Sequence, residues 1–110
     1  MSYYTPDKWV IVRATSKEHP QIDKVLGSWY GGYAGSDEWR LSSGITKIEP
    51  MLDHKYPHYL VHNYSGSVYT CYVNNVGMSL YVRSVAENLF TELEEKGMGK
   101  MRVINITELL

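Results

Sequence analysis

Three histidines spaced four residues apart are the first candidates for chemistry in this sequence of 110 residues. On a helix, His54, His58 and His62 would share one face, where imidazoles can bind a metal ion. Pro57 and the alternating aromatic and β-branched residues around it predict a strand instead. On a strand, His58 and His62 lie about 13 Å apart, whereas metal–nitrogen bonds are about 2 Å long. The sequence therefore predicts no metal site.

Possible nucleophiles lack the local sequence of a catalytic motif. Cys71, the only cysteine, lies between Tyr69 and Val73 in a predicted strand, where a small buried side chain is typical. No serine is surrounded by Gly-X-Ser-X-Gly. The glycine-containing segment 97–100 follows a helix rather than preceding one, so its amides do not predict a phosphate loop. The sequence predicts no catalytic residue and no cofactor, and an enzyme is the least favoured class.

Aromatic residues at predicted turns are the strongest candidates for binding. The chain has ten Tyr, three Trp and one Phe, and tyrosine is favoured where one end of the ring is apolar and the other is hydrated. Such positions occur at interfaces and ligand clefts; the alternative, that the rings only cover a thin curved sheet, stays open. The candidate binding residues are Trp29, Tyr30, Tyr33, Trp39, Arg40, Tyr64 and Tyr69.

The charge and the cysteine content argue against several classes of protein. The net charge is −1 and no run of Lys or Arg is present, so nucleic-acid binding is not expected. Residues 1–7 are polar, unlike a secretory signal, and no segment approaches the roughly 18 apolar residues of a membrane span. A single cysteine fits a reducing compartment. We expect a cytoplasmic protein that does not enter membranes; its oligomeric state stays open.

Short β-rich runs separated by turn residues predict a largely antiparallel sheet. Gly27 interrupts one of these runs and predicts a β-bulge. The turn at residues 65–67 predicts a β-hairpin, and the glycines between residues 31 and 35 predict a turn with positive φ. The predicted strands are residues 9–12, 24–30, 38–41 continued by 45–49, 58–64, 68–73 and 101–106.

One amphipathic helix is predicted near residues 79–96. Ser79 or Ser84 would cap its start, and Gly97 would follow its last turn. Leu89 and Phe90 are expected to be almost fully buried against the sheet. Apolar residues at helical spacing define the buried stripe: Val82, Val85, Ala86, Leu89, Phe90 and Leu93.

These elements predict an α+β fold in a single domain over residues 1–110. The expected architecture is a bent antiparallel sheet of five or six strands with the helix packed on it. A partly open barrel is the alternative arrangement of the same strands.

Three segments carry a resemblance to known proteins. They are residues 28–33 (Ser-Trp-Tyr-Gly-Gly-Tyr), 39–45 (Trp-Arg-Leu-Ser-Ser-Gly-Ile) and 65–71 (Ser-Gly-Ser-Val-Tyr-Thr-Cys). Over about residues 24–73 the chain resembles small uncharacterised proteins encoded by tailed bacteriophages. The resemblance implies a non-essential accessory role in the cytoplasm of an infected bacterium, and it carries no catalytic assignment.

Two functions follow as hypotheses. The first is a non-enzymatic binding protein that engages a bacterial host protein through its aromatic turns. The alternative is a protein that binds or sequesters a small nucleotide-like ligand, with rings stacked on a base and Arg40 or Arg83 contacting a phosphate. A wide convex aromatic patch would favour a protein partner, and a concave pocket with convergent polar groups would favour a small ligand.

Overall fold

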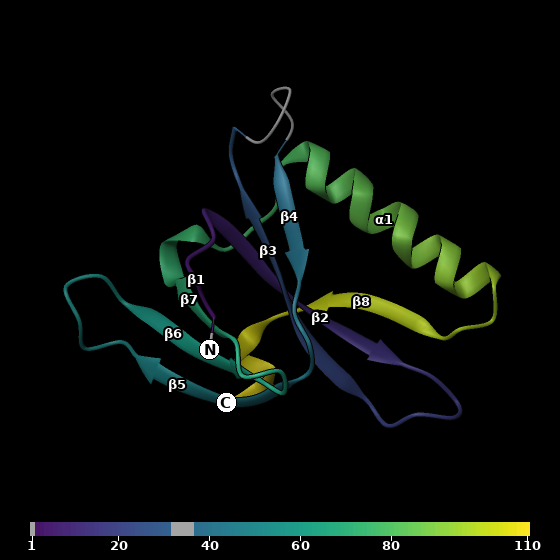
Figure 1. The fold of residues 1–110 in the computed structure, drawn as a ribbon, viewed down its shortest axis with the longest axis horizontal. Helices are drawn as coiled ribbons and strands as arrows, with labels where there is room; N and C mark the ends of the chain where they lie inside the picture. Colours follow the sequence, from purple (N-terminus) through teal and green to yellow (C-terminus); the bar gives the residue numbers. More distant parts are fainter. Residues whose placement is uncertain (1, 32–36) are drawn as a thin grey trace.

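The computed structural model describes residues 2–31 and 37–110, which form two four-stranded sheets and one α-helix, α1 (Leu80–Glu95) (Figure 1). The outer sheet has the strand order β1-β7-β6-β5, and the central sheet has the order β4-β3-β2-β8. The strands are β1 (Tyr3–Tyr4), β2 (Lys8–Thr15), β3 (Ile22–Trp29), β4 (Glu38–Leu41), β5 (Ile45–Met51), β6 (His58–Asn63), β7 (Val68–Tyr72) and β8 (Lys100–Ile104). Short 3₁₀-helices follow at Val73–Asn75 and Ile106–Leu109.

The central sheet is covered on both faces, which explains the continuous apolar run at its centre. In β2, Trp9 and Ile11 pack toward the outer sheet, and Val10 and Val12 pack toward α1. Four consecutive buried residues are typical of a strand with a layer on either side, whereas a strand with one open face alternates. The outer sheet does alternate: in β6 every second residue, beginning with Tyr59, is buried.

The predicted α+β class is confirmed, but the single bent sheet of five or six strands is wrong, because the described residues form two sheets of four strands and no closed barrel. The chain leaves the central sheet at Leu41 and enters the outer sheet at Ile45, so the segment expected as one interrupted strand belongs to two sheets. The corner between them is fixed by Ser42. Its Oγ accepts a hydrogen bond from the Val25 N–H at 2.8 Å and donates to the Ser43 carbonyl at 2.7 Å.

Gly27 does not mark a β-bulge, contrary to the prediction. The register of β3 is regular on both sides, with Gly27 opposite Trp9 and opposite Arg40. A Cβ at this position would lie 3.1 Å from the Cβ of Pro6, which is buried. The glycine is therefore explained by the close approach of the chain before β2 rather than by an extra residue.

The helix begins and ends where the sequence predicts. Ser79 caps it by accepting from the Val82 N–H at 3.2 Å, and Gly97 has a φ of 68° in the turn that follows. Leu89 and Phe90 are half-buried, however, rather than almost fully buried. The helix lies along β8 at one side of the central sheet (Figure 1), so only part of its apolar stripe is covered.

The last predicted strand ends two residues early. After β8 the chain turns into the 3₁₀-helix Ile106–Leu109, which begins with a capping box between Asn105 and Glu108. Glu108 also lies 3.5 Å from Arg13 of β2, which is paired with Asp23 of β3 at 2.9 Å. These contacts tie the end of the chain to the central sheet. Among the described residues, no helix is both long and apolar enough to cross a lipid bilayer.

Candidate anion-binding pocket

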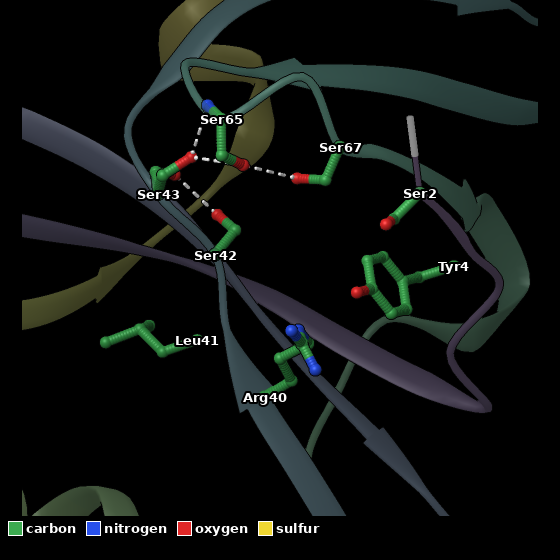
Figure 2. A pocket seen from close by; sticks show the side chains of 8 residues that line it. All are labelled: Ser2, Tyr4, Arg40, Leu41, Ser42, Ser43, Ser65 and Ser67. Carbon is green, nitrogen blue, oxygen red and sulfur yellow. Dashed lines mark hydrogen bonds between the residues drawn. The ribbon is translucent and has the colours of Figure 1, made fainter.

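A pocket of about 430 Å³ opens where the N-terminal segment, β4 and the turn between β6 and β7 meet (Figure 2). Of the eight described residues that line it, five are serines and only Arg40 is charged. Figure 2 shows the serines, Tyr4 and Arg40 around one space although they come from segments that are far apart in the sequence, whereas Leu41 points away from it. The lining residues are Ser2, Tyr4, Arg40, Leu41, Ser42, Ser43, Ser65 and Ser67.

Each wall of the pocket is positioned by a different piece of the fold. The parallel pairing of β1 with β7 sets Tyr4 opposite Tyr69. The strand β4 ends at Leu41, and the corner that follows brings Ser42 and Ser43 to the junction of the two sheets. The turn after β6 is held against this corner because the Tyr64 N–H donates to the Gly44 carbonyl at 2.7 Å. The pocket therefore lies on the seam between the sheets.

Hydrogen bonds join three of the serines into a chain across this seam. Ser43 Oγ donates to Ser65 Oγ at 3.0 Å and accepts from the Ser65 N–H, and Ser65 Oγ lies 3.2 Å from Ser67 Oγ. Ser67 Oγ also accepts from Asn63 Nδ2 at 3.1 Å. Whichever of Ser65 and Ser67 donates to the other, one hydroxyl hydrogen of the pair has no acceptor among the described residues. The hydroxyl group that carries this hydrogen can donate it to a ligand.

Arg40 supplies the positive charge of the pocket. Its guanidinium carbon lies 4.7 Å from the centroid of the Tyr4 ring, which is the geometry of a cation–π contact. No carboxylate of the described residues lies within ion-pair distance of Arg40, and none lines the pocket. An arginine left without a counter-charge among hydroxyl groups is suited to hold an anion.

Tyr69 packs against Tyr4, one of the residues that line the pocket. It is buried, with 1% of its surface exposed, and its ring lies 4.9 Å from that of Tyr4 between centroids. Burial raises the pKa of Tyr69, and the nearby Arg40 charge opposes this effect without cancelling it. Tyr69 therefore stays neutral, and its ring holds in place the Tyr4 ring that Arg40 contacts.

The structure brings only some of the predicted binding residues together. Arg40 lines the pocket and Tyr69 packs beneath it, but Trp39 faces the other side of β4, as the alternation in this strand predicts. Tyr64 is 86% exposed, whereas Tyr69 is buried in the core, so the two rings do not lie on one surface.

Trp29 and Tyr30 lie at the end of β3. Trp29 is half-buried, and its Nε1 donates to the Thr5 carbonyl at 3.0 Å. Tyr30 is exposed, and its backbone N–H donates to Asp7 Oδ2 at 2.9 Å. Tyr33, in the predicted glycine turn, lies outside the described residues.

The sequence interpretation missed the serines and Tyr4. The only signal for them was the pair of similar turns, Ser-Ser-Gly at residues 42–44 and Ser-Gly-Ser at residues 65–67. In the structure, residues 42–44 join the two sheets and residues 65–67 form the turn between β6 and β7. That they also face each other depends on how the two sheets pack, and local sequence does not carry that information.

The histidines and Cys71 lie outside the pocket. His58 and His62 share one face of β6, as predicted, and His62 Nε2 lies 2.6 Å from Glu49 Oε1. The part of the chain that the structure describes contains no cluster of three metal-ligand side chains. Cys71 is buried in the core, and burial raises the pKa of its thiol well above the usual range, so the thiol is neutral.

No protein-family model matches this chain, and no curated protein or solved structure matches it. The resemblance of residues 24–73 to proteins of tailed bacteriophages stays a prediction from the sequence. The geometry of the pocket is therefore the basis for a functional proposal.

Proposed function

We propose that this protein is a non-enzymatic binding protein that holds the phosphate or a similar oxyanion of a small ligand beside Arg40. The observation that carries the proposal is an arginine without a carboxylate partner among the described residues, set in a concave pocket lined by hydroxyl groups. Of the two functions expected from the sequence, this is the small-ligand alternative.

The donors of the pocket fit the oxygen atoms of an anion. The guanidinium of Arg40 can give two parallel hydrogen bonds to two oxygens of one group. The hydroxyls of Ser2 and Tyr4 have no hydrogen bond to another described residue, and the Ser65–Ser67 pair has one hydrogen to give. An oxyanion would accept hydrogen bonds from these groups, whereas a cation would be repelled by the positive charge of Arg40.

The lining residues support binding rather than catalysis. A serine acts as a nucleophile when an adjacent base removes its proton. The pocket is lined by no histidine, aspartate or glutamate among the described residues, and Ser42 and Ser43 use their hydroxyls to hold the corner and the turn. We therefore assign the serines to recognition and to the rigidity of the pocket.

The ring-stacking part of the sequence hypothesis receives less support than the phosphate part. Trp39 faces away from Arg40, and the Tyr4 ring already contacts Tyr69 and Arg40. A base bound in this pocket would therefore find no free aromatic face among these residues. We therefore propose only the anionic group of the ligand and not its organic part. A phage accessory protein could use this pocket to sequester such a ligand.

The proposal is tested by calorimetric titration with phenyl phosphate, adenosine monophosphate and, as an uncharged control, adenosine. We expect both phosphates to bind and adenosine to bind at least tenfold more weakly, since hydrogen bonds to a charged group contribute about 1.5–3 kcal/mol. Arg40→Gln should lose about tenfold or more in affinity for both phosphates. Arg83→Gln, which removes one positive charge from the exposed side of α1, is the matched control and should bind like the unaltered protein.

Two results would contradict the proposal. One is that neither phosphate binds to a protein shown by circular dichroism to be folded. The other is an equal loss of affinity in Arg40→Gln and Arg83→Gln, because this would indicate a nonspecific effect of net charge.

A further inference from the structure

A second pocket, of about 360 Å³, lies at the opposite end of β6 and β7 from the anion-binding pocket of Figure 2, which is called the serine pocket below. It is formed between the β5–β6 loop, which ends at Pro57, and the 3₁₀-helix Val73–Asn75, which follows Tyr72 at the end of β7. Six residues of β6 and four of β7 lie between the two pockets along the hairpin, so they are separate sites. The lining residues are Lys55, Tyr56, Pro57, Tyr72, Asn74 and Asn75.

The backbone around this pocket is held in place by hydrogen bonds. The Val73 N–H donates to the Pro57 carbonyl at 3.0 Å, which closes the loop onto the 3₁₀-helix. The indole Nε1 of the buried Trp9 donates to the Tyr72 carbonyl at 2.8 Å. These bonds fix the frame of the site before any ligand arrives, which lowers the entropy lost on binding.

Aromatic rings form the apolar part of the site. Tyr56 is 65% exposed, and the Lys55 ammonium lies 5.6 Å from the centroid of its ring. The Tyr72 ring is held by an edge-to-face contact with His58, at 5.5 Å between centroids and 61° between planes. Tyrosine rings, with an apolar face and a polar hydroxyl, are enriched at binding surfaces.

The amide and hydroxyl groups of the site are neutral and have no hydrogen-bond partner among the described residues. The side-chain amides of Asn74 and Asn75 form no hydrogen bond with another described residue, and neither do the hydroxyls of Tyr56 and Tyr72. Each amide has two donors and an acceptor, and each hydroxyl has a donor and acceptors. The described lining contains no carboxylate, and its one charge, on Lys55, is directed over a ring.

We propose that this pocket binds a neutral sugar, as a monosaccharide or as the terminal unit of a glycan. A sugar ring has a face of C–H groups that packs on an aromatic ring, and hydroxyls that both donate and accept, which matches rings beside asparagine amides. A proline-rich segment, the other ligand of tyrosine-lined surfaces, has only carbonyl acceptors, so it would leave the acceptor oxygens of Asn74 and Asn75 without a donor. The site does not depend on the proposed function of the serine pocket.

The test is saturation-transfer difference NMR with a panel of methyl glycosides of glucose, galactose, mannose and N-acetylglucosamine and with decaproline. We expect at least one glycoside to bind through the protons of one ring face. Tyr56→Ala and Asn74→Ala should each weaken that binding about tenfold or more, and Tyr56→Phe should retain most of it. Tyr64→Ala removes a more exposed tyrosine at the other end of the hairpin and should change nothing.

Three results would overturn this proposal. The first is that no glycoside of the panel binds, and the second is that Tyr56→Ala binds as the unaltered protein does. The third is that decaproline binds through Tyr56 and the glycosides do not. Tyr56 and Asn74 are exposed, so circular dichroism should show that both variants fold and that any loss is a loss of the site.

Discussion

At the scale of single residues, burial affects the titration of two acidic side chains, Cys71 and Tyr69. Burial raises the pKa of Cys71 and of Tyr69 above the ordinary values of 9.0 and 10.0. For an acid with a raised pKa, the folded state holds its proton at a pH where the unfolded state has lost it. Both groups therefore stabilise the fold fully below about pH 9, and this contribution is lost as the pH rises further.

We expect the free energy of unfolding to fall with rising pH above about pH 9. Urea denaturation at pH 7.5, 9 and 10.5 would measure the decrease. In Cys71→Val, which removes the titrating thiol and keeps a side chain of similar volume, the decrease should be shallower. The same slope in both proteins would show that the buried thiol does not contribute.

Gly99 is expected to be the glycine least tolerant of substitution. Its φ is 110°, and a Cβ there would lie 2.4 Å from the Thr15 carbonyl oxygen. Gly99→Ala should lower the free energy of unfolding by more than about 2 kcal/mol, through strain and through displacement of the backbone of β2. Gly97, with a φ of 68° and open space around it, is the control, and Gly97→Ala should cost about 1 kcal/mol. Equal costs would contradict the role of the contact.

At the scale of elements, α1 shows that apolar residues at helical spacing are not all buried to the same extent. Val82 is 1% exposed and Leu89 is half-buried, because α1 lies along β8 and covers the central sheet from one side. Val82→Ala should therefore cost about 2 kcal/mol, and Leu89→Ala should cost less despite losing more atoms. Urea denaturation of both variants is the measurement. A larger cost for Leu89→Ala would show that the helix packs more closely than the structure has it.

The elements that the sequence predicts well are those specified locally. The helix needs only the spacing of its apolar residues with Ser79 and Gly97 at its ends, and the 58–73 hairpin needs only alternation and a short turn. The strand β1 has two residues, too few for any period to show. The division into two sheets depends on Ser42 bonding to Val25, 17 residues earlier in the chain, which no local pattern reveals.

At the scale of the whole molecule, the serine pocket exists because two sheets meet. Arg40 was predictable as a candidate because it lies beside an aromatic turn, but Tyr4 and Ser65 reach it only through the packing of distant segments. Anion binding should therefore stabilise the segments at the junction of the two sheets. We expect phenyl phosphate to slow hydrogen exchange at residues 42–44 and 64–67 more than in α1, as measured by mass spectrometry. Equal slowing everywhere would indicate only global stabilisation.

The central claim is that Arg40 and the serine hydroxyls form an anion site, and amide NMR tests it most directly. Titration of the ¹⁵N-labelled protein with phenyl phosphate should shift the backbone amides of Arg40, Ser43, Ser65 and Ser67 in a saturable way, and Arg40→Gln should abolish these shifts. Saturable shifts confined to α1 or to the β5–β6 loop, or no shifts at millimolar phenyl phosphate, would contradict the account.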